Sequence, residues 1–177
     1  MPRSIRLGYI AGLDVRARPF AFVAFALMWV AFSALGIFAL DLSPFTSLWG
    51  GFTGAVLQYA SELWHHLGHA VAARRTGYPM SGITFLGPLA LSRYPANEGE
   101  LSGKIHIQRA LGGPVASAIL TVITGLLLLA QSNAPQGVAY WLTLITFVDN
   151  LLVFTLGAFL PLGFTDGSTL LHWWGKP

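Results

Sequence analysis

Long apolar runs alternate with short polar segments along this chain. The hydrocarbon core of a bilayer is about 30 Å thick, and a helix crosses it in roughly 20 residues because each residue rises about 1.5 Å. Four runs reach that length, and the segments between them carry most of the charges and turn-forming residues. The pattern therefore predicts four transmembrane helices, at Pro19 to Leu40, Gly50 to Ala73, Ala110 to Ala130 and Val138 to Leu160.

A different pattern occupies the longest polar segment, Thr76 to Gln108. Its stretch "SGITFLGPLALSRYP" alternates β-branched or aromatic residues with small or polar ones, between glycine and proline breakers. This alternation predicts a short β-hairpin at the membrane surface. Backbone at such a depth must be hydrogen-bonded, so the hairpin needs a protein partner or an aqueous cavity. Its edge offers a place for an extended peptide, and a surface hairpin without a ligand is the alternative.

Composition agrees with a membrane protein. The chain of 177 residues is 54% hydrophobic and only 10% charged, whereas about 25% of the residues in a soluble domain are charged. We find no internal repeat, low-complexity tract or hydrophilic domain. The expected fold class is an all-α polytopic membrane protein, a single domain over residues 1–177, with about four transmembrane helices and a short membrane-surface β-hairpin between the second and third.

The basic residues predict how the helices are oriented. They precede the first run, lie between the second and third, and follow the fourth, whereas the two alternate loops have no Lys or Arg. By the positive-inside rule, both termini are cytoplasmic. The first run is too long for the core of a signal peptide and is interpreted as a retained helix. We expect an integral protein of the plasma (inner) membrane, in contact with the lipid bilayer. No nucleic acid is expected, because no basic patch is interleaved with exposed aromatics.

The stretch "ELWHHLGHAVAARR" carries the candidate chemistry. His65 and His69 are four residues apart, so both lie on one helix face at the spacing that lets two imidazoles bind one metal. Glu62 and His66 fall on the same side. Ionisable groups inside a transmembrane helix are costly and usually functional. Because the chain has no cysteine, a metal must use His, Asp or Glu. A lone histidine here would more often be structural, but this cluster favours a metal site.

A catalytic zinc site usually has three protein ligands plus water, so one ligand must come from elsewhere. The candidates are Asp149, Asp166, His106 and His172. Asp166 is favoured because the fourth helix would bring it to the same membrane side as the histidine pair, with Pro161 and Gly163 turning the chain back. Asp149 is interpreted as a polar contact between helices.

Four segments stand out in order along the chain: the opening "IRLGYIAGLDVRARPFAF", the helix and strand "HHLGHAVAARRTGYPMSGITF", "RALGGPVASAIL", and "FLPLGFTDGSTLL". Together they resemble the site-2 protease family of intramembrane zinc metallopeptidases. The resemblance implies that His65, His69 and Asp166 hold Zn²⁺. Three motif positions differ: His66 stands where the family has glutamate, and Ser117 and Ala158 stand where it has asparagine.

In the family, the motif glutamate takes a proton from the water that attacks the peptide carbonyl. The resemblance therefore gives that role to His66, with Glu62 as a possible helper or as an orienting group for a ligand imidazole. It also implies a transmembrane-protein substrate, bound as an extended strand along the hairpin at Gly82, Ile83, Thr84 and Phe85.

Two further hypotheses stay open. A catalytically inactive metal-binding relative that acts as a scaffold for membrane proteins is favoured by the missing glutamate. A fourth protein ligand at His66 would make the site structural. A histidine-rich oxidoreductase with two irons is suggested by the adjacent His65 and His66, although five histidines in all are few for such a site.

Overall fold

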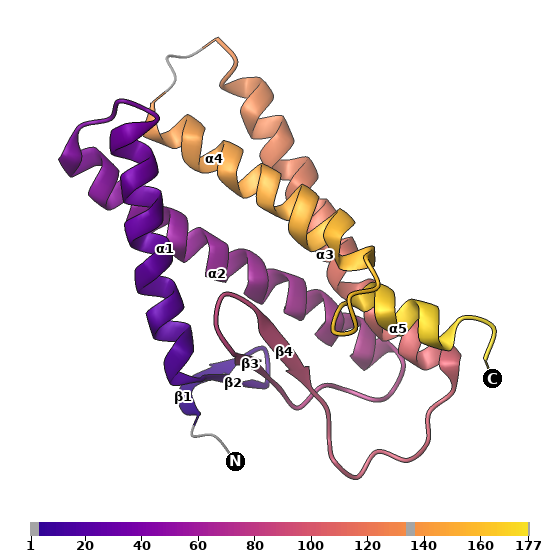
Figure 1. Ribbon diagram of the computed structural model, residues 1–177. Helices are drawn as coiled ribbons and strands as arrows, with labels where there is room; N and C mark the ends of the chain where they lie inside the picture. Colours follow the sequence, from indigo (N-terminus) through magenta and orange to yellow (C-terminus); the bar gives the residue numbers. More distant parts are fainter. Residues whose placement is uncertain (1–3, 134–136, 177) are drawn as a thin grey trace.

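The computed structural model describes residues 4–133 and 137–176, and shows a bundle of long helices with a small sheet at one end (Figure 1). The helices are α1 (Pro19–Phe38), α2 (Pro44–Arg75), α3 (Gly103–Ala130), α4 (Val138–Asp149) and α5 (Asp166–Trp173). A π-helical segment η1 (Asn150–Leu156) and a 3₁₀ turn η2 (Gly157–Phe159) continue α4. The strands are β1 (Ile5–Ile10), β2 (Leu13–Ala17), β3 (Gly82–Phe85) and β4 (Ala90–Arg93).

Within the described residues, three helical segments are long and apolar enough to cross a membrane: Pro19–Phe38, Gly103–Ala130 and Val138–Phe159. The second predicted helix is present as α2, which is 32 residues long. It does not meet the same apolar criterion, because polar residues such as Glu62, His65 and His69 interrupt its hydrophobic sequence. α2 packs against both α1 and α3.

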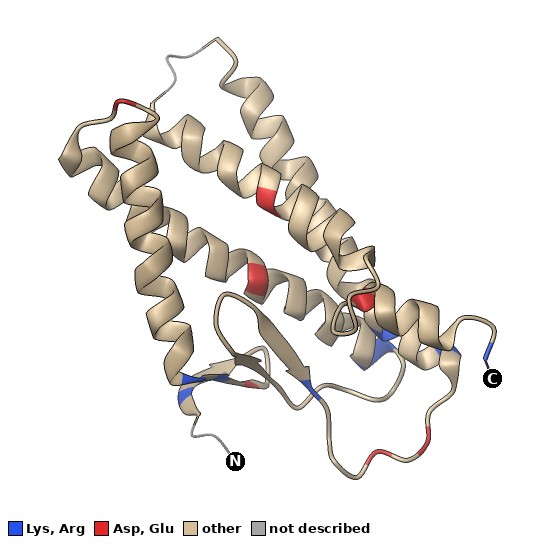
Figure 2. Ribbon diagram, viewed as in Figure 1, with Lys and Arg blue, Asp and Glu red and all other residues tan. Residues whose placement is uncertain are grey.

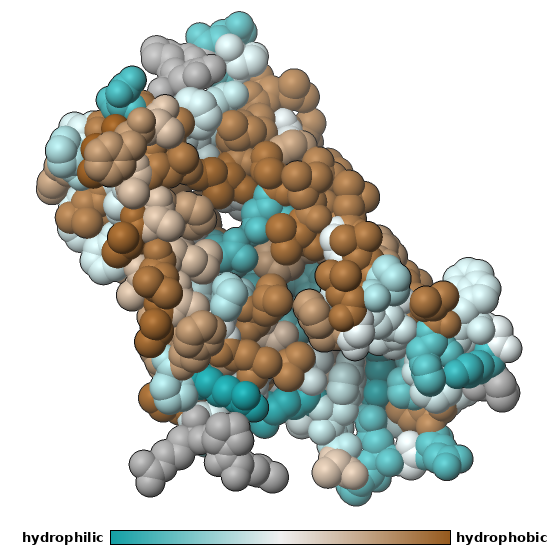
Figure 3. Space-filling model, viewed as in Figure 1, coloured by the Kyte–Doolittle hydropathy of each residue, from teal (hydrophilic) through white to brown (hydrophobic). Residues whose placement is uncertain are grey.

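Most of the remaining helical surface is apolar. Val122 and Leu126 of α3 are 61% and 62% exposed, and Figure 3 shows hydrophobic atoms covering the upper, helical part of the molecule. Leucine and valine exposed in such numbers on long helices are suited to lipid contact. The chain is an integral membrane protein.

Small residues let α2 and α3 approach closely. A Cβ added at Gly68 would collide with the backbone carbonyl of Gly112, and one added at Gly112 would collide with that of Gly68. Such close backbone contact is how helices gain packing energy where surrounding lipid is as apolar as the side chains. This contact lies one residue before His69 and therefore fixes the α2–α3 distance beside the histidine cluster.

The sheet is larger than predicted. Its strand order is β1-β2-β3-β4. β1 and β2 form an antiparallel hairpin, β2 runs parallel to β3, and β3 and β4 form the predicted hairpin. The prediction of an all-α fold with a single hairpin therefore missed β1 and β2, which complete a four-stranded sheet. The parallel pairing joins Asp14 to Gly82, and such a long-range pair leaves no mark in a local hydrophobic pattern.

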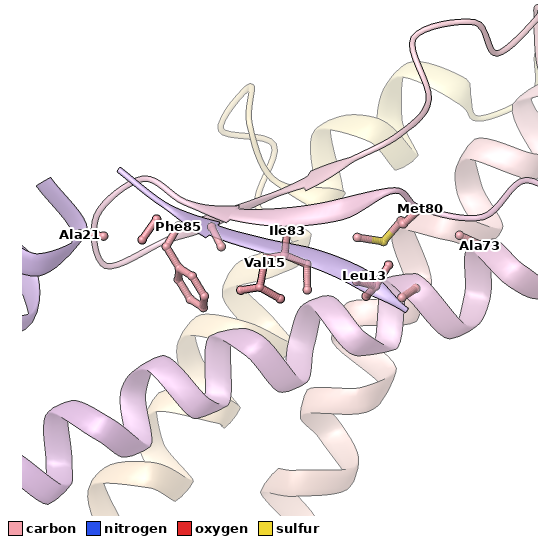
Figure 4. Packing of buried hydrophobic residues seen from close by; sticks show 10 residues of the cluster. Leu13, Val15, Ala21, Ala73, Met80, Ile83 and Phe85 are labelled. Carbon is pink, nitrogen blue, oxygen red and sulfur yellow. The ribbon is translucent and has the colours of Figure 1, made fainter. Parts of the chain in front are cut away.

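The sheet lies over the end of α2 that carries the histidines. Figure 4 shows Leu13, Val15, Ile83 and Phe85 pointing from β2 and β3 toward the helix below. They pack with Met80 and with Ala70 and Ala73 of α2 in one buried cluster. Alanines on this face of α2 let the strands come close, and the sheet is thereby fixed beside the candidate site.

Charge is distributed unevenly along the long axis of the molecule. The Lys and Arg residues of the described part gather at the end that carries the sheet and α5, whereas the opposite end shows an acidic residue only (Figure 2). Arg3, one of the basic residues used for the orientation, and residues 134–136 of the second non-basic loop lie outside the described residues.

Candidate metal centre

His65 and His69 from α2 meet Asp166 from the start of α5. The Nε2 atoms of the two imidazoles are 3.0 Å apart. His65 Nε2 is 3.2 Å from Asp166 Oδ2, and His69 Nε2 is 3.3 Å from Asp166 Oδ1. One potential ligand atom from each residue lies within 4.8 Å of the others, and both histidines are buried. This arrangement can hold one metal ion.

The chain between η2 and α5 delivers Asp166. Leu160 adopts an extended conformation, Gly163 has φ +88°, and the chain turns back toward α2 and α3. Gly167 packs directly against the carbonyl of Phe159, where a Cβ would collide. α5 then packs on α3. The Pro161–Gly163 break predicted from the sequence is therefore what turns Asp166 toward the site.

The other ring nitrogen of each histidine has an orienting partner on α3. His69 Nδ1 is 2.8 Å from the carbonyl oxygen of Arg109. Because a carbonyl only accepts, this shorter contact requires the proton on Nδ1 and leaves the Nε2 lone pair directed into the site, with the Gly113 N–H also 3.2 Å from Nδ1. His65 Nδ1 is 3.0 Å from Ser117 Oγ. Metal-binding histidines usually have such a partner, which fixes the ring orientation and tautomer.

Gly113 forms one wall of the site. A Cβ at this position would collide with the Nε2 atoms of both His65 and His69. Only glycine leaves room for the two imidazoles to converge, since every other residue carries that carbon. Gly113, the second glycine of "GGP" on α3, is therefore needed for the two imidazoles to fit side by side.

Asp166 is held as an anion. Burial raises the pKa of its carboxyl, but the hydrogen bonds to His65 and His69 outweigh burial and lower the pKa to about 2. A carboxylate that stays ionised at neutral pH is available as an oxygen ligand.

The other candidates for the third ligand lie elsewhere. Asp149 lies against Gln58 of α2: with the Gln58 amide oriented so that its nitrogen faces the carboxylate, this nitrogen donates to the two oxygens at 2.7 and 3.1 Å. His106 stacks on Trp173 with ring centroids 4.2 Å apart. His172 lies 3.4 Å from Lys176 Nζ. In the described part of the chain, the one group of three potential ligands found is His65, His69 and Asp166.

His66 lies beside the site but faces other partners. Its Nε2 is 3.2 Å from Glu62 Oε1, and its Nδ1 is 2.9 Å from Ser92 Oγ on β4. Its ring centroid is 5.5 Å from that of His69. Since both nitrogens of His66 are engaged by protein groups, the arrangement at the site is one of three ligands.

Glu62 is buried, and Oε1 also accepts a hydrogen bond from the backbone N–H of Ala90. It therefore ties α2 to β4 as well as to His66. The sequence showed Glu62 near the histidines, but gave no signal for its contact with the strand. Ser92 and Arg109 were likewise missed, since each reaches the histidines only through tertiary packing.

The strand expected to bind a peptide is paired on both of its edges within the sheet. Gly82, Ile83, Thr84 and Phe85 form β3, which pairs with β2 on one side and β4 on the other. Their backbone groups are therefore used within the sheet. The open edge on this side is β4, at the end of the strand order. Ala90 N–H points out of the sheet toward Glu62, and by alternation the backbone of Ser92 points the same way.

No family model matches the chain, and no curated protein matches it. A search of solved structures finds the site-2 protease from Methanocaldococcus jannaschii, with a TM-score of 0.60 and 23% sequence identity over 96% of this chain and 70% of that chain. The chain has a site-2 protease fold. The predicted resemblance is confirmed at the level of the fold, and the activity of this chain is a separate question.

Proposed function

We propose that this protein is an intramembrane zinc metalloendopeptidase that cleaves transmembrane-protein substrates near the cytoplasmic side. The observation that carries the proposal is the convergence of two imidazole Nε2 atoms and one carboxylate on a single point. Nitrogen and oxygen ligands of this kind suit zinc, and three protein ligands are the number found in catalytic zinc sites. A bound zinc would polarise the peptide carbonyl and make a bound water more acidic.

The proposed membrane arrangement includes α2 as a fourth span. Its position between α1 and α3 and its length of 32 residues support this. Its polar groups face the site and neighbouring protein, as ionisable residues in membrane helices usually do. The concentration of Lys and Arg at the sheet end (Figure 2) supports a cytoplasmic location for that end and for both termini, in the plasma (inner) membrane.

His66 and Glu62 would handle the proton. Glu62 Oε1 is placed to accept a hydrogen bond from His66 Nε2, which stabilises the imidazolium that forms when His66 takes a proton at Nδ1. This is how a carboxylate supports a catalytic histidine in other hydrolases. His66 would then pass the proton to the leaving amine. In this assignment Ser92 Oγ, now next to Nδ1, has to give way to the reacting group.

The substrate would bind as an extended strand on β4. A helical substrate shields its amides and must unwind locally before it can be cleaved, and an open strand edge offers the hydrogen bonds that an unwound segment needs. Pairing at Ala90 would displace Glu62 from the Ala90 N–H. Substrate binding would thus release a carboxylate beside His66.

A second candidate function is a metal-binding scaffold that contacts membrane proteins without cleaving them. The observation that favours it is the engagement of both His66 nitrogens by Glu62 and Ser92, which leaves His66 no free nitrogen until one contact breaks. The scaffold would keep the metal and the helix packing.

Cleavage in liposomes distinguishes the two. The purified chain would be reconstituted with a library of fluorescent transmembrane peptides and compared with His66→Glu, His66→Ala, Glu62→Gln and His69→Ala. The proposal expects zinc-dependent cleavage by the unmodified chain, none by His69→Ala, and a loss of about 10²-fold or more on replacing His66 with Ala. Cleavage by His66→Glu alone would instead support the scaffold, because the rest of the machinery would then be intact without a competent proton carrier.

A further inference from the structure

A cavity separate from the metal centre lies between the β1–β2 hairpin and the helices α1 and α2. Its volume is about 450 Å³, a size typical of sites for small ligands. Its walls come from β1, β2, α1 and α2, with one residue of β3, and include Leu7, Tyr9, Phe22, Phe25, Val56 and Tyr59. They are almost entirely apolar. None of the wall residues belongs to the candidate metal centre.

β1, which forms the outer wall, exposes large apolar side chains. Ile5, Leu7 and Tyr9 are 52%, 53% and 66% exposed, and β1 is an edge strand. An edge strand of this kind in water would be prone to aggregation. At a bilayer surface the same side chains reach the acyl region, with tyrosine at headgroup level. β1 lies beside the N-terminal end of α1 (Figure 1).

Positive charge borders the cavity. The Arg6 guanidinium lies over the Tyr9 ring, 3.9 Å from its centroid, and Tyr9 is a wall residue. Arg6, Arg16 and Arg93 all pair with Asp14, at 3.0, 2.6 and 2.9 Å. Three guanidinium groups against one carboxylate leave a net charge of +2 before Arg18 is counted. Arg18 precedes α1 directly, and Figure 2 shows basic residues grouped there.

We propose that this cavity binds an acyl chain of an anionic phospholipid whose phosphate rests on Arg6 and Arg18. Exposed apolar wall residues such as Leu7 and Phe22 would contact lipid in the membrane, and the excess positive charge would select an anionic headgroup over a zwitterionic one. Arginine beside the bilayer extends its charged end to the headgroups while its stem packs on apolar surface.

The walls fit an acyl chain better than a peptide. An extended peptide inside the cavity would need partners for its own amides. The Tyr59 hydroxyl is already within hydrogen-bond distance of the carbonyls of Ala21 and Gly87, at 2.6 and 2.9 Å. The edge of β1 also carries an irregularity between Arg6 and Gly8, and such a bulge disrupts the regular ladder that an added strand needs.

Native mass spectrometry tests this with phosphatidylglycerol and phosphatidylcholine of identical acyl chains, added to the detergent-purified protein. We expect one phosphatidylglycerol per chain, bound about tenfold more tightly than phosphatidylcholine. Ala60→Trp, at an exposed wall position of α2, fills the cavity and should abolish that adduct. Arg6→Gln or Arg18→Gln should each weaken phosphatidylglycerol binding about fivefold. Circular dichroism and a single gel-filtration peak establish that each variant is folded.

Arg75→Gln is the matched control, since Arg75 is an exposed arginine at the C-terminal end of α2 and is not a wall residue of the cavity. It should leave binding unchanged. Equal binding of the two lipids overturns the proposal, and so does phosphatidylglycerol binding that survives Ala60→Trp. A protein dimer that Ala60→Trp dissociates would assign the cavity to a second copy of the chain and also overturn it.

Discussion

Glu62 Oε1 lies 3.2 Å from His66 Nε2, so the histidine at the expected glutamate position is itself held by a carboxylate one helical turn earlier. The same oxygen accepts from Ala90 N–H on the sheet edge. A carboxylate therefore lies beside the residue that the resemblance places at the family's glutamate position, although it comes from four residues earlier in the chain. This arrangement gives His66 a partner that can stabilise its protonated form and links that partner to the strand where a substrate would bind.

Gly113→Ala should remove metal binding without touching a ligand. The added methyl would collide with Nε2 of His65 and of His69, so the two nitrogens could no longer converge. We expect zinc affinity to fall by more than about 100-fold, beyond the 10 to 100-fold that loss of an orienting partner usually costs, measured by competition with a chromophoric chelator. Gly99→Ala is the control, because a Cβ there meets nothing within 4 Å. Unchanged affinity in Gly113→Ala would contradict the site geometry.

Ser117→Ala should have a smaller effect at the same site. Its hydroxyl lies 3.0 Å from His65 Nδ1, and loss of an orienting partner usually costs about 10 to 100-fold in metal affinity. The same chelator competition measures it. Ser132→Ala, an exposed serine beyond α3, should bind zinc like the unmodified protein. If both serine variants bind equally, His65 needs no partner at Nδ1.

Gly68→Ala should destabilise the helix bundle. The new methyl would press on the Gly112 carbonyl and on Ala116 of α3, and overpacking of this kind costs about 1–3 kcal/mol. Reversible unfolding of the purified protein in mixed micelles measures the free energy of unfolding. Gly99→Ala again serves as the comparison. A Gly68→Ala protein as stable as this control would show that the α2–α3 contact is looser than described.

Lowering the pH should destabilise the folded protein, because Asp14 in the sheet becomes protonated. The hydrogen bond from Arg93, with that from Arg16, lowers the pKa of Asp14 below its usual value of about 4 although burial raises it. A carboxyl whose folded-state pKa is lowered contributes stability above the unfolded pKa, and loses it as the pH falls toward the folded value. The melting temperature should therefore drop below about pH 4, and Asp14→Asn should show a smaller drop. Glu100→Gln, at an exposed site, should behave like the parent; an Asp14→Asn profile identical to it would contradict this role.

The long helices could be predicted from the sequence because the apolar run that indicates each of them is a local pattern. An apolar run of about 20 residues predicts a transmembrane helix, and α1 begins at Pro19 as predicted. α2 and α3 extend beyond the predicted runs, to Pro44–Arg75 and Gly103–Ala130. The added residues do not belong to a long apolar run. Those at the start of α2 pack against α1, where Trp29 Nε1 donates to the Leu48 carbonyl, and those at the start of α3 pack against α5.

Only two of the four strands could be predicted from the sequence. Alternation in "SGITFLGPLALSRYP" identified β3 and β4, whereas β1 and β2 have an irregular pattern interrupted by Gly8 and by the Ala11–Gly12 turn with positive φ. Their place in the sheet depends on pairing Asp14 with Gly82. That pairing leaves β4 rather than Gly82–Phe85 with an open edge, and β4 is therefore where the proposal places the substrate.

The metal-site residues were suggested by helical spacing and by resemblance, and the structure brings His65, His69 and Asp166 together. Their supports were not foreseeable. Arg109 reaches His69 through a backbone carbonyl, which every residue type possesses, and Ser92 reaches His66 only because β4 lies beside α2. Contacts of this kind are set by packing between elements and leave no residue pattern along the chain.

Zinc content measured by elemental analysis of the detergent-purified protein tests the central claim most directly. His65→Ala and Asp166→Ala remove proposed ligands, and His106→Ala removes a histidine that stacks on Trp173 away from the site. About one zinc per chain in the unmodified protein and in His106→Ala, with loss in both ligand variants, is the predicted result. Absence of bound zinc after reconstitution, or zinc retained in both ligand variants, would contradict the three-ligand site and the peptidase built on it.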